Sequence, residues 1–181
     1  KLYCKRRLIA YNVLLVIMFA NTNRKKNAMK LDDIDRKLLT LLQTDSKTGV
    51  KELASTLGLT KTPVYDRIRR LEEARLIKKY VAVVEQSQLP SYMVVFCSVS
   101  LDSQKLQAIE SFSAAVLGFP EVMECYLMGG ANDFLLKLIV RDLNDFHQFS
   151  SGKLAALENI SKIQSSFVLN EIKSSTVVPI Y

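Results

Sequence analysis

Basic and hydrogen-bonding side chains gather in residues 59–80, LTKTPVYDRIRRLEEARLIKKY. Arginine pairs with guanine edges and with phosphate, lysine binds phosphate, and a threonine hydroxyl both donates and accepts hydrogen bonds. These are the chemical groups that a DNA-reading helix needs. Asp66, Glu72 and Glu73 share the segment, however, and a solvated helix with internal ion pairs has a similar composition. The positions of the charges around the helix decide between the two interpretations.

The apolar residues of this segment define the inward face of a helix. Val64, Ile68 and Leu71 recur at i, i+4 and i+7, a spacing that places side chains on one face. Polar side chains then occupy the opposite face, as a helix that enters a major groove requires. We expect Arg69 to contact a guanine edge. Phosphate contacts are expected from Arg67, Arg70, Arg75, Lys78 and Lys79. The predicted DNA-binding residues are Thr60, Lys61, Thr62, Tyr65, Asp66, Arg69, Arg70 and Lys78.

Two further helices are predicted before this one. The pattern of residues 34–42 is helical, and an Asp-Asp pair in front of it supplies an N-cap. Val50–Leu57 forms a second apolar face, and Gly58 favours a left-handed turn at its end. Thr60 is a suitable N-cap for the helix that follows. Helices joined by a tight glycine-containing turn predict a helix-turn-helix unit.

The charge distribution agrees with a DNA-binding first half. The chain of 181 residues has a formal net charge of +7. Residues 1–28 contain 7 basic and no acidic residues, residues 29–85 contain 12 basic and 9 acidic residues, and residues 86–181 contain 6 and 9. A polyanionic partner is therefore expected to bind the first half. With 3 cysteines, no C-x-x-C pair and 1 histidine, the composition disfavours a structural zinc site and a disulfide framework.

Residues 1–28 fit no part of this scheme. Leu8–Ala20 is an apolar run behind a basic stretch, and it is shorter than the roughly 17–25 residues of a membrane span. No small-residue cleavage pattern follows it. We expect residues 1–28 to be an extraneous or disordered tail. A membrane anchor is the alternative, although a membrane is not expected as a partner.

Residues 92–181 alternate between strand and helix patterns. Apolar runs rich in β-branched residues predict strands, and helical periods separate them. A glycine-rich connection at residues 129–132 joins two of the strands. The order βαββαβ predicts a ferredoxin-like α/β sandwich, and we expect the uncovered face of its sheet to pair with a second copy of the chain. The predicted elements are strands at 92–101, 122–130 and 133–140, helices at 104–119 and 143–157, and a final strand or pair of strands at 160–180.

With these elements placed, residues 31–180 resemble the Lrp/AsnC (feast/famine) transcriptional regulators. The resemblance is carried, in order, by LDDIDRKLLTLLQTDSK, KELASTLGLTKTPVYDRIRRLEEARLIKKYVAVV, MGGANDFLLKLIVRDLNDF and SSFVLNEIKSSTVVPI. It implies an α+β fold, in which an N-terminal winged helix-turn-helix domain joins a C-terminal ferredoxin-like βαββαβ (RAM/Lrp-type effector) domain. The expected boundaries are 29–80 for the DNA-binding domain, 81–91 for a hinge strand and linker, and 92–181 for the dimerisation and effector domain.

The resemblance also implies an effector, in many members an amino acid or a related small molecule bound between subunits. The family's Gly-x-x-Asp turn falls on residues 130–133, so the candidate effector-binding residues are Met128, Gly129, Gly130, Asn132 and Asp133. Exposed glycine amides suit a ligand carboxylate, and Asp133 suits an ammonium. The alternative is an ordinary turn in which Gly130 has a positive φ and Asp133 caps the hairpin. Arg75 stands where the family commonly has glycine, and we expect it to forfeit the left-handed cap of the reading helix.

Together these observations predict a sequence-specific DNA-binding transcriptional regulator that responds to an amino acid or a related small molecule. Expected partners are double-stranded DNA, further copies of the chain as a homodimer or a higher even oligomer such as an octamer, and the effector. No cofactor or metal is expected, and the expected location is the cytoplasm. An enzyme is not expected, because no nucleophile and base can be assembled around His147, while Cys97 and Cys125 lie in apolar strands as small core residues. The remaining alternative is a small-molecule-sensing oligomeric scaffold whose helix-turn-helix binds protein instead of DNA.

Overall fold

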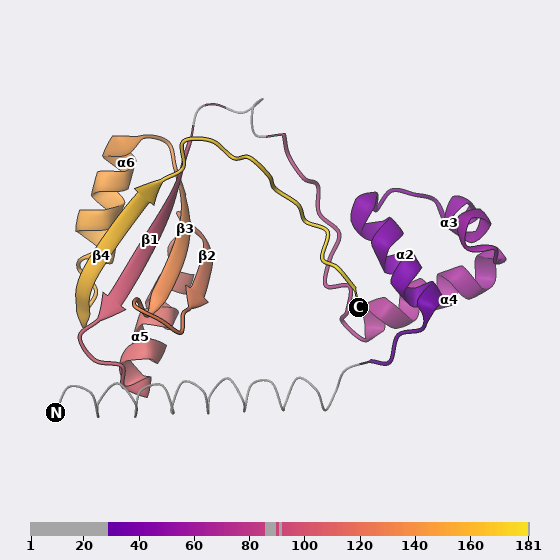
Figure 1. Ribbon diagram of the computed structural model, residues 1–181, viewed down its shortest axis with the longest axis horizontal. Helices are drawn as coiled ribbons and strands as arrows, with labels where there is room; N and C mark the ends of the chain where they lie inside the picture. The colour runs from indigo at the N-terminus through magenta and orange to yellow at the C-terminus, as the bar shows by residue number, and fades with distance from the viewer. Residues whose placement is uncertain (1–28, 86–89, 91, 181) are drawn as a thin grey trace. The chain divides into compact units, whose positions relative to one another are not determined.

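The computed structural model describes residues 29–85, 90 and 92–180, so the predicted tail at residues 1–28 lies outside the described residues. The described chain forms two compact units (Figure 1). One unit spans Glu85–Glu171, and the other contains the residues up to Val84 together with those from Ile172 onward. The expected domain 92–181 is longer than the sheet unit, since the residues from Ile172 onward group with the helical unit. Ile180 packs against the core of that helical unit.

Three helices form the helical unit, and their bounds are α2 Asp33–Thr44, α3 Val50–Leu57 and α4 Lys61–Glu73. Asp32 caps α2, since its carboxylate accepts a hydrogen bond of 2.7 Å from the Asp35 amide. Gly58 ends α3 with a φ of 65°, a left-handed conformation that glycine adopts at little steric cost. Thr60 occupies the N-cap position of α4, although its side chain makes no capping hydrogen bond.

The apolar faces of the three helices meet in one core. Val64 and Leu71 of α4 are fully buried, and Ile68 packs against the same cluster. Leu38 from α2 and Leu53 from α3 lie opposite them in this cluster. The inward face predicted for α4 is confirmed, which leaves its polar face directed to solvent.

The end of α4 forms a left-handed turn without glycine. Arg75 has a φ of 55°. Its amide donates to the Glu72 carbonyl at 2.9 Å, and the Leu76 amide donates to the Leu71 carbonyl at 3.0 Å, which is the hydrogen-bond pattern of a Schellman motif. The expectation that arginine forfeits this cap is therefore wrong. Backbone hydrogen bonds hold an L-residue in a conformation that costs about 1–2 kcal/mol.

Beyond this turn, the predicted wing and hinge strand do not form in the described residues. Val81–Val84 has no regular secondary structure, and Val83 is 74% exposed. In the same way, the last strand ends at Phe167, and the described residues after it, 168–180, have no regular secondary structure. An extended segment becomes a strand only when another strand bonds its backbone, so alternating valines alone do not produce one.

A four-stranded antiparallel sheet forms the second unit. The strand order is β2-β3-β1-β4, so β1 lies between β3 and β4. With the element order βαββαβ, this arrangement confirms the predicted ferredoxin-like fold. The second predicted helix is split into a short α-helix and a π-helix. The bounds are β1 Met93–Leu101, α5 Leu106–Leu117, β2 Val122–Leu127, β3 Phe134–Val140, α6 Leu143–His147, η2 Gln148–Leu154 and β4 Ile160–Phe167.

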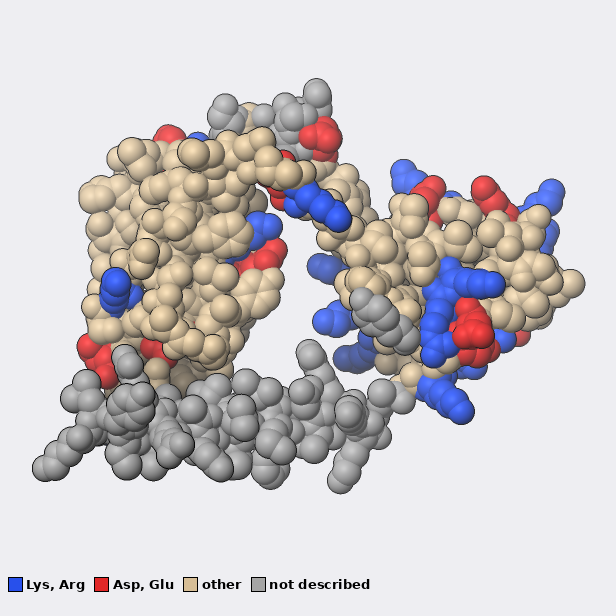
Figure 2. Space-filling model, viewed as in Figure 1, with Lys and Arg blue, Asp and Glu red and all other residues tan. Residues whose placement is uncertain are grey.

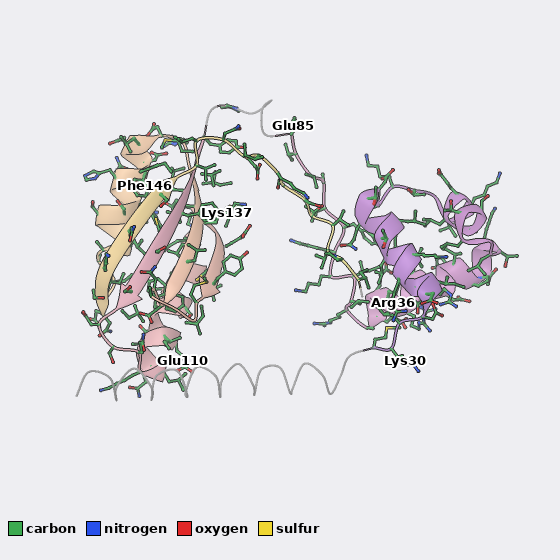
Figure 3. The ribbon with its side chains drawn as sticks, viewed as in Figure 1. Lys30, Arg36, Glu85, Glu110, Lys137 and Phe146 are labelled. Atoms are coloured by element: carbon green, nitrogen blue, oxygen red, sulfur yellow. The ribbon has the colours of Figure 1, made fainter. Side chains whose placement is uncertain are left out.

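Residues alternate between a helix-covered face and an open face of this sheet. Val95 and Val99 are fully buried together with Phe112 of α5 and Phe149 of η2. On the covered side, Phe146 of α6 packs edge-on against Phe167 with ring centroids 5.1 Å apart, whereas Lys137 of β3 pairs with Glu124 across the open face (Figure 3). The open face also carries the half-buried apolar side chains of Val94, Phe96, Leu135 and Ile139.

The apolar side chains of Leu106 and Cys125 in this unit are exposed, and for Cys125 this corrects the expectation of a core position. Leu106 is 68% exposed because it is the first residue of α5 and does not reach the sheet. Cys125 is exposed because β2 is an edge strand, whereas Cys97 in the central strand β1 is buried as predicted. Within the described part of the chain, no helix combines the length and apolar character that a bilayer span requires.

Candidate DNA-reading helix and effector turn

All eight predicted DNA-binding residues are exposed in the helical unit. Lys61, Thr62 and Tyr65 lie in the first turns of α4, where a helix that enters a groove presents its side chains. Tyr65 is 60% exposed although it is aromatic, and its phenol is available for a hydrogen bond or for stacking. Figure 2 shows lysine and arginine side chains gathered on this unit, with few of them on the visible face of the sheet unit.

Arg69, the predicted base-reading residue, is exposed and paired within its own helix. Its Nε donates to the Glu73 carboxylate at 2.8 Å, and both side chains are about two-thirds exposed (68% and 63%). The hydrogen bond and charge of Glu73 raise the pKa of the Arg69 guanidinium, which therefore stays charged. Exposed pairs of this kind contribute little to stability, because water and salt screen them. Arg69 is accordingly free to exchange Glu73 for a base edge at small cost.

The side chains of Arg67 and Arg70 both reach α2, and neither faces solvent alone. Arg67 donates to Asp32 at 2.6 Å and to Asp35 at 2.7 Å, and its side chain is only 23% exposed. Arg70 donates to the second oxygen of Asp35 at 2.6 Å and remains half exposed. Arg67 is thus committed to holding α4 against α2, whereas Arg70 retains a solvent-facing side.

Asp35 is the functional residue that sequence reasoning missed. Its side chain is 1% exposed, and it accepts hydrogen bonds from Arg67, Arg70 and the Asp32 amide. A carboxylate buried to this degree requires charged partners. The signal was present in the spacing of Asp32 and Asp35, which is that of a capping box. Arg67 and Arg70 lie more than thirty residues away in the sequence, so a local pattern does not reveal that they bind Asp35.

The chain after α4 is fastened to the helix by a tyrosine. The Tyr80 hydroxyl donates to Glu72 at 2.8 Å. Partial burial of the phenol and the adjacent Glu72 carboxylate raise the pKa of Tyr80 to about 12, so the hydroxyl keeps its donor proton at neutral pH. Lys78 and Lys79 lie in the sequence between Glu72 and Tyr80, and both are exposed. The Tyr80–Glu72 hydrogen bond therefore holds these two lysines close to α4.

The predicted effector turn joins β2 to β3, and Asp133 is its most connected residue. One carboxylate oxygen of Asp133 accepts from the Leu101 amide at 2.8 Å, and the other accepts from Gln104 Nε2 at 2.6 Å. Its own amide donates to the Val99 carbonyl at 2.9 Å. Asp133 therefore joins the end of β1 to the start of β3. Gln104 was not anticipated, because nothing in its local sequence indicates this partner.

The glycines of the turn are exposed but conformationally ordinary. Among the described residues, Gly58 is the glycine with a positive φ, so the idea that Gly130 supplies one is wrong. A Cβ added at Gly130 would meet nothing within 4 Å. Met128 is 44% exposed, and Asn132 accepts a hydrogen bond of 3.3 Å from Ser100. The turn thus presents open backbone beside an aspartate that already has partners.

The described side chains include no cluster of three or more His, Cys, Asp or Glu arranged to hold a metal ion. A helix-turn-helix with a polar, basic second helix, followed by a ferredoxin-like unit, defines a DNA-binding regulator. Residues 31–72 match the AsnC-type helix-turn-helix domain, and residues 94–178 match the Lrp/AsnC ligand binding domain. The chain belongs to the Lrp/AsnC family of transcriptional regulators.

Individual relatives agree with this assignment over nearly their whole length. The Bkd operon transcriptional regulator of Pseudomonas aeruginosa is 34% identical over 151 residues, covering 83% of this chain and 99% of the relative. The proline dehydrogenase transcriptional activator of Rhodobacter capsulatus is 38% identical over 141 residues, covering 78% and 91%. A transcriptional regulator from Neisseria meningitidis, crystallised as a complex with L-Met, is 33% identical with a TM-score of 0.77, covering 83% of this chain and 97% of that one.

Proposed function

We propose that this DNA-binding transcriptional regulator reads its site through the exposed face of α4. Arg69 is the base-reading side chain, and Thr62 and Tyr65 support it, while Lys78 and Arg70 bind phosphates. The observation that carries the proposal is that Val64 and Leu71 bury one face of α4 completely, which leaves the opposite polar face in solvent. Because its relatives are bacterial regulators, we place the protein in the cytoplasm, where bacterial DNA lies.

Fluorescence anisotropy with a duplex from the region beside its own gene tests the assignment at two salt concentrations. Arg69→Ala is expected to weaken binding to the specific site by roughly tenfold to a hundredfold while leaving non-specific duplex binding nearly unchanged. Lys78→Ala is expected to weaken binding to all duplexes evenly and to reduce the salt slope by about 1. Arg141→Ala is the control, since Arg141 is exposed and paired with Asp145 in the sheet unit.

The same titration decides between DNA and a protein partner for the helix-turn-helix. Neutralised phosphates release counterions, so DNA binding falls steeply as salt rises. If no duplex binds the parent protein at either salt concentration, the scaffold alternative replaces the DNA-reading role of α4. If Arg69→Ala and Lys78→Ala bind like the parent, α4 is not the reading helix.

We further propose that an amino acid binds at the β2–β3 turn. The Neisseria relative was crystallised with L-Met, and the turn of this chain offers exposed backbone at Gly129 and Gly130. Because both Asp133 oxygens already accept hydrogen bonds, Asp133 is not assigned to the ligand ammonium in this proposal. The backbone amides of the turn bind the ligand carboxylate. Asp133 holds the turn in shape.

Isothermal titration with L-methionine, followed by a pool of amino acids, tests this site. Gly130→Ala is expected to weaken binding at least tenfold, because its methyl group occupies the approach to the backbone. Gly152→Ala is the matched control, since an added Cβ also meets nothing within 4 Å there. If Gly130→Ala and Gly152→Ala bind the amino acid with equal affinity, the β2–β3 turn is not the binding site.

A second copy of the chain is the proposed partner of the open sheet face. This face carries Phe96 and Ile139, and no helix among the described residues covers it. Two such faces bury one another in a symmetric dimer. Phe96→Glu is expected to shift the protein toward monomer in analytical ultracentrifugation. Leu117→Glu, at an 88% exposed position of α5, is the control and should leave the mass unchanged.

A further inference from the structure

The end of the chain is part of the helical unit. After β4 the chain leaves the sheet, and the residues from Ile172 onward group with the three helices. Figure 1 shows the end of the yellow segment, the last described residues, beside these helices. Gln43 of α2 and Val178 are 135 positions apart in the sequence, yet they are joined by two hydrogen bonds. The contact is therefore tertiary, and it lies at the surface of the unit that contains α4.

The two hydrogen bonds reproduce the way in which one strand binds another. The Val178 amide donates to Gln43 Oε1 at 2.7 Å, and Gln43 Nε2 donates to the Val178 carbonyl at 3.2 Å. A carboxamide carries both a donor and an acceptor, so it satisfies both backbone groups of one residue. A glutamate in its place would lose the donor. The arrangement holds both backbone groups of Val178 against the side of α2.

Burial along the C-terminal segment is confined to its end. Leu169 is 98% exposed and Ile172 is 88% exposed. Ile180 is partly buried and packs against the cluster formed by Leu38, Leu42 and the other core residues of the helices. Ser175 shapes the approach, since its hydroxyl accepts a hydrogen bond of 3.2 Å from the Val177 amide. The apolar anchor and the backbone clamp thus lie within three residues of each other.

We propose that residues 175–180 are a docking strap that completes the DNA-binding unit. Resting on the proposed role of α4, the inference is that the strap controls the order of the reading helix. The strap holds α2, and α2 holds α4 through Asp35, Arg67 and Arg70. Because the strap continues from β4, it is a second covalent connection between the sheet unit and the helical unit. A change at the sheet is transmitted to the reading helix by docking or release of the strap.

Hydrogen exchange on full-length variants tests the docking directly. Ile180→Ser removes the anchor, and Ile172→Ser is the matched control in the same segment. Exchange of the α2 and α4 amides is expected to accelerate about fivefold or more in Ile180→Ser and to stay at the parent rate in Ile172→Ser. Gln43→Ala is a second variant, since alanine favours the helix and faster exchange would then report the lost clamp alone. Parent-like exchange in both Ile180→Ser and Gln43→Ala would overturn the proposal.

DNA titrations of the same variants test the coupling to the reading helix. Ile180→Ser is expected to lower duplex affinity about threefold or more, because binding must then order a looser helix. Faster exchange with unchanged affinity would overturn the coupling and leave the strap a packing element only. Failure of the proposed DNA-reading role is recognised separately: Arg69→Ala would then bind DNA like the parent, while the exchange rates would still decide whether the strap docks.

Discussion

Arg70 on α4 and Asp35 on α2 are joined by a hydrogen bond of 2.6 Å, and Arg67 reaches the other oxygen of the same carboxylate at 2.7 Å. Asp35 is buried and its arginine partners are only partly so. One carboxylate therefore fixes two successive turns of α4 against α2. The direction in which the reading helix presents its polar face depends on this contact.

Replacing Asp35 should destabilise the helical unit. Asp35→Ala removes three hydrogen bonds to a buried carboxylate and leaves two guanidinium groups without it, so we expect a loss of about 2–3 kcal/mol in the free energy of unfolding. Asp33→Ala is the control, because its side chain is 93% exposed and pairs only with Arg36; an exposed pair contributes at most about 1 kcal/mol. Urea denaturation of both variants measures the difference. Equal losses of unfolding free energy in Asp35→Ala and Asp33→Ala would show that the burial of Asp35 does not add to stability.

Asp32 makes the helical unit sensitive to acid. Hydrogen bonds from the Asp35 amide and from Arg67 hold the pKa of Asp32 below its ordinary value of 3.8. A lowered folded-state pKa stabilises the folded form above the ordinary value, and this contribution disappears as the pH falls through the folded-state pKa. Asp32→Asn keeps a capping side chain but cannot titrate.

The variant should therefore lose less stability than the parent between pH 5 and pH 3. Urea denaturation at both values measures this. The comparison with the parent is essential, because Arg141 also lowers the pKa of Asp145 in the sheet unit, and this group titrates in both proteins. Identical slopes for the two proteins would mean that Asp32 does not contribute.

Local patterns predicted the elements whose partners lie nearby in the sequence. The period of Val64, Ile68 and Leu71 identified the buried face of α4. This prediction follows from side-chain geometry within one element. The helix bounds Val50–Leu57 were recovered without error for the same reason.

What the sequence could not provide are the contacts made between distant segments. Arg67 looked like a phosphate-binding residue because its charge was visible and its partner Asp35 was not. Residues 168–180 were predicted to form a strand, but the Val178 amide donates to Gln43 of α2 and not to another strand. Valine alternation shows which residues suit a strand but not whether a neighbouring strand is present.

Glycine at position 75 should stabilise the protein. Arg75 has a φ of 55° in the turn that ends α4, and glycine adopts this conformation without the steric cost that an L-side chain carries. We expect Arg75→Gly to raise the free energy of unfolding by about 1 kcal/mol, even though glycine gains flexibility in the unfolded chain. Arg75→Ala is the control, since it removes the charge and keeps the strain. If alanine stabilises as much as glycine, charge repulsion and not backbone strain is responsible.

Removing Glu73 should strengthen DNA binding through Arg69. Glu73 holds the guanidinium at 2.8 Å and places a negative charge on α4, the helix proposed to read DNA. Glu73→Gln leaves a weaker partner, so we expect duplex affinity to rise by about twofold to fivefold at low salt, with the gain shrinking as salt rises. Anisotropy titrations of the single variant and of Glu73→Gln combined with Arg69→Ala measure it. A gain of the same size in the double variant would show that Glu73 acts by general repulsion and not through Arg69.

We expect Asp133 to stabilise the sheet unit even when no amino acid is bound. Asp133→Asn cannot keep acceptors for both the Leu101 amide and Gln104, because one carboxylate oxygen becomes a donor. We expect it to lower the free energy of unfolding of the sheet unit by about 1–2 kcal/mol without any amino acid present. Gln104→Ala removes only the hydrogen bond from the exposed Gln104 side chain, so it should lower the free energy of unfolding by less. Thermal denaturation of both variants, each with and without L-methionine, separates the two roles. A stable Asp133→Asn that no longer responds to the amino acid would assign the carboxylate to the ligand. Loss of stability in its absence assigns the carboxylate to the connection between β1 and β3.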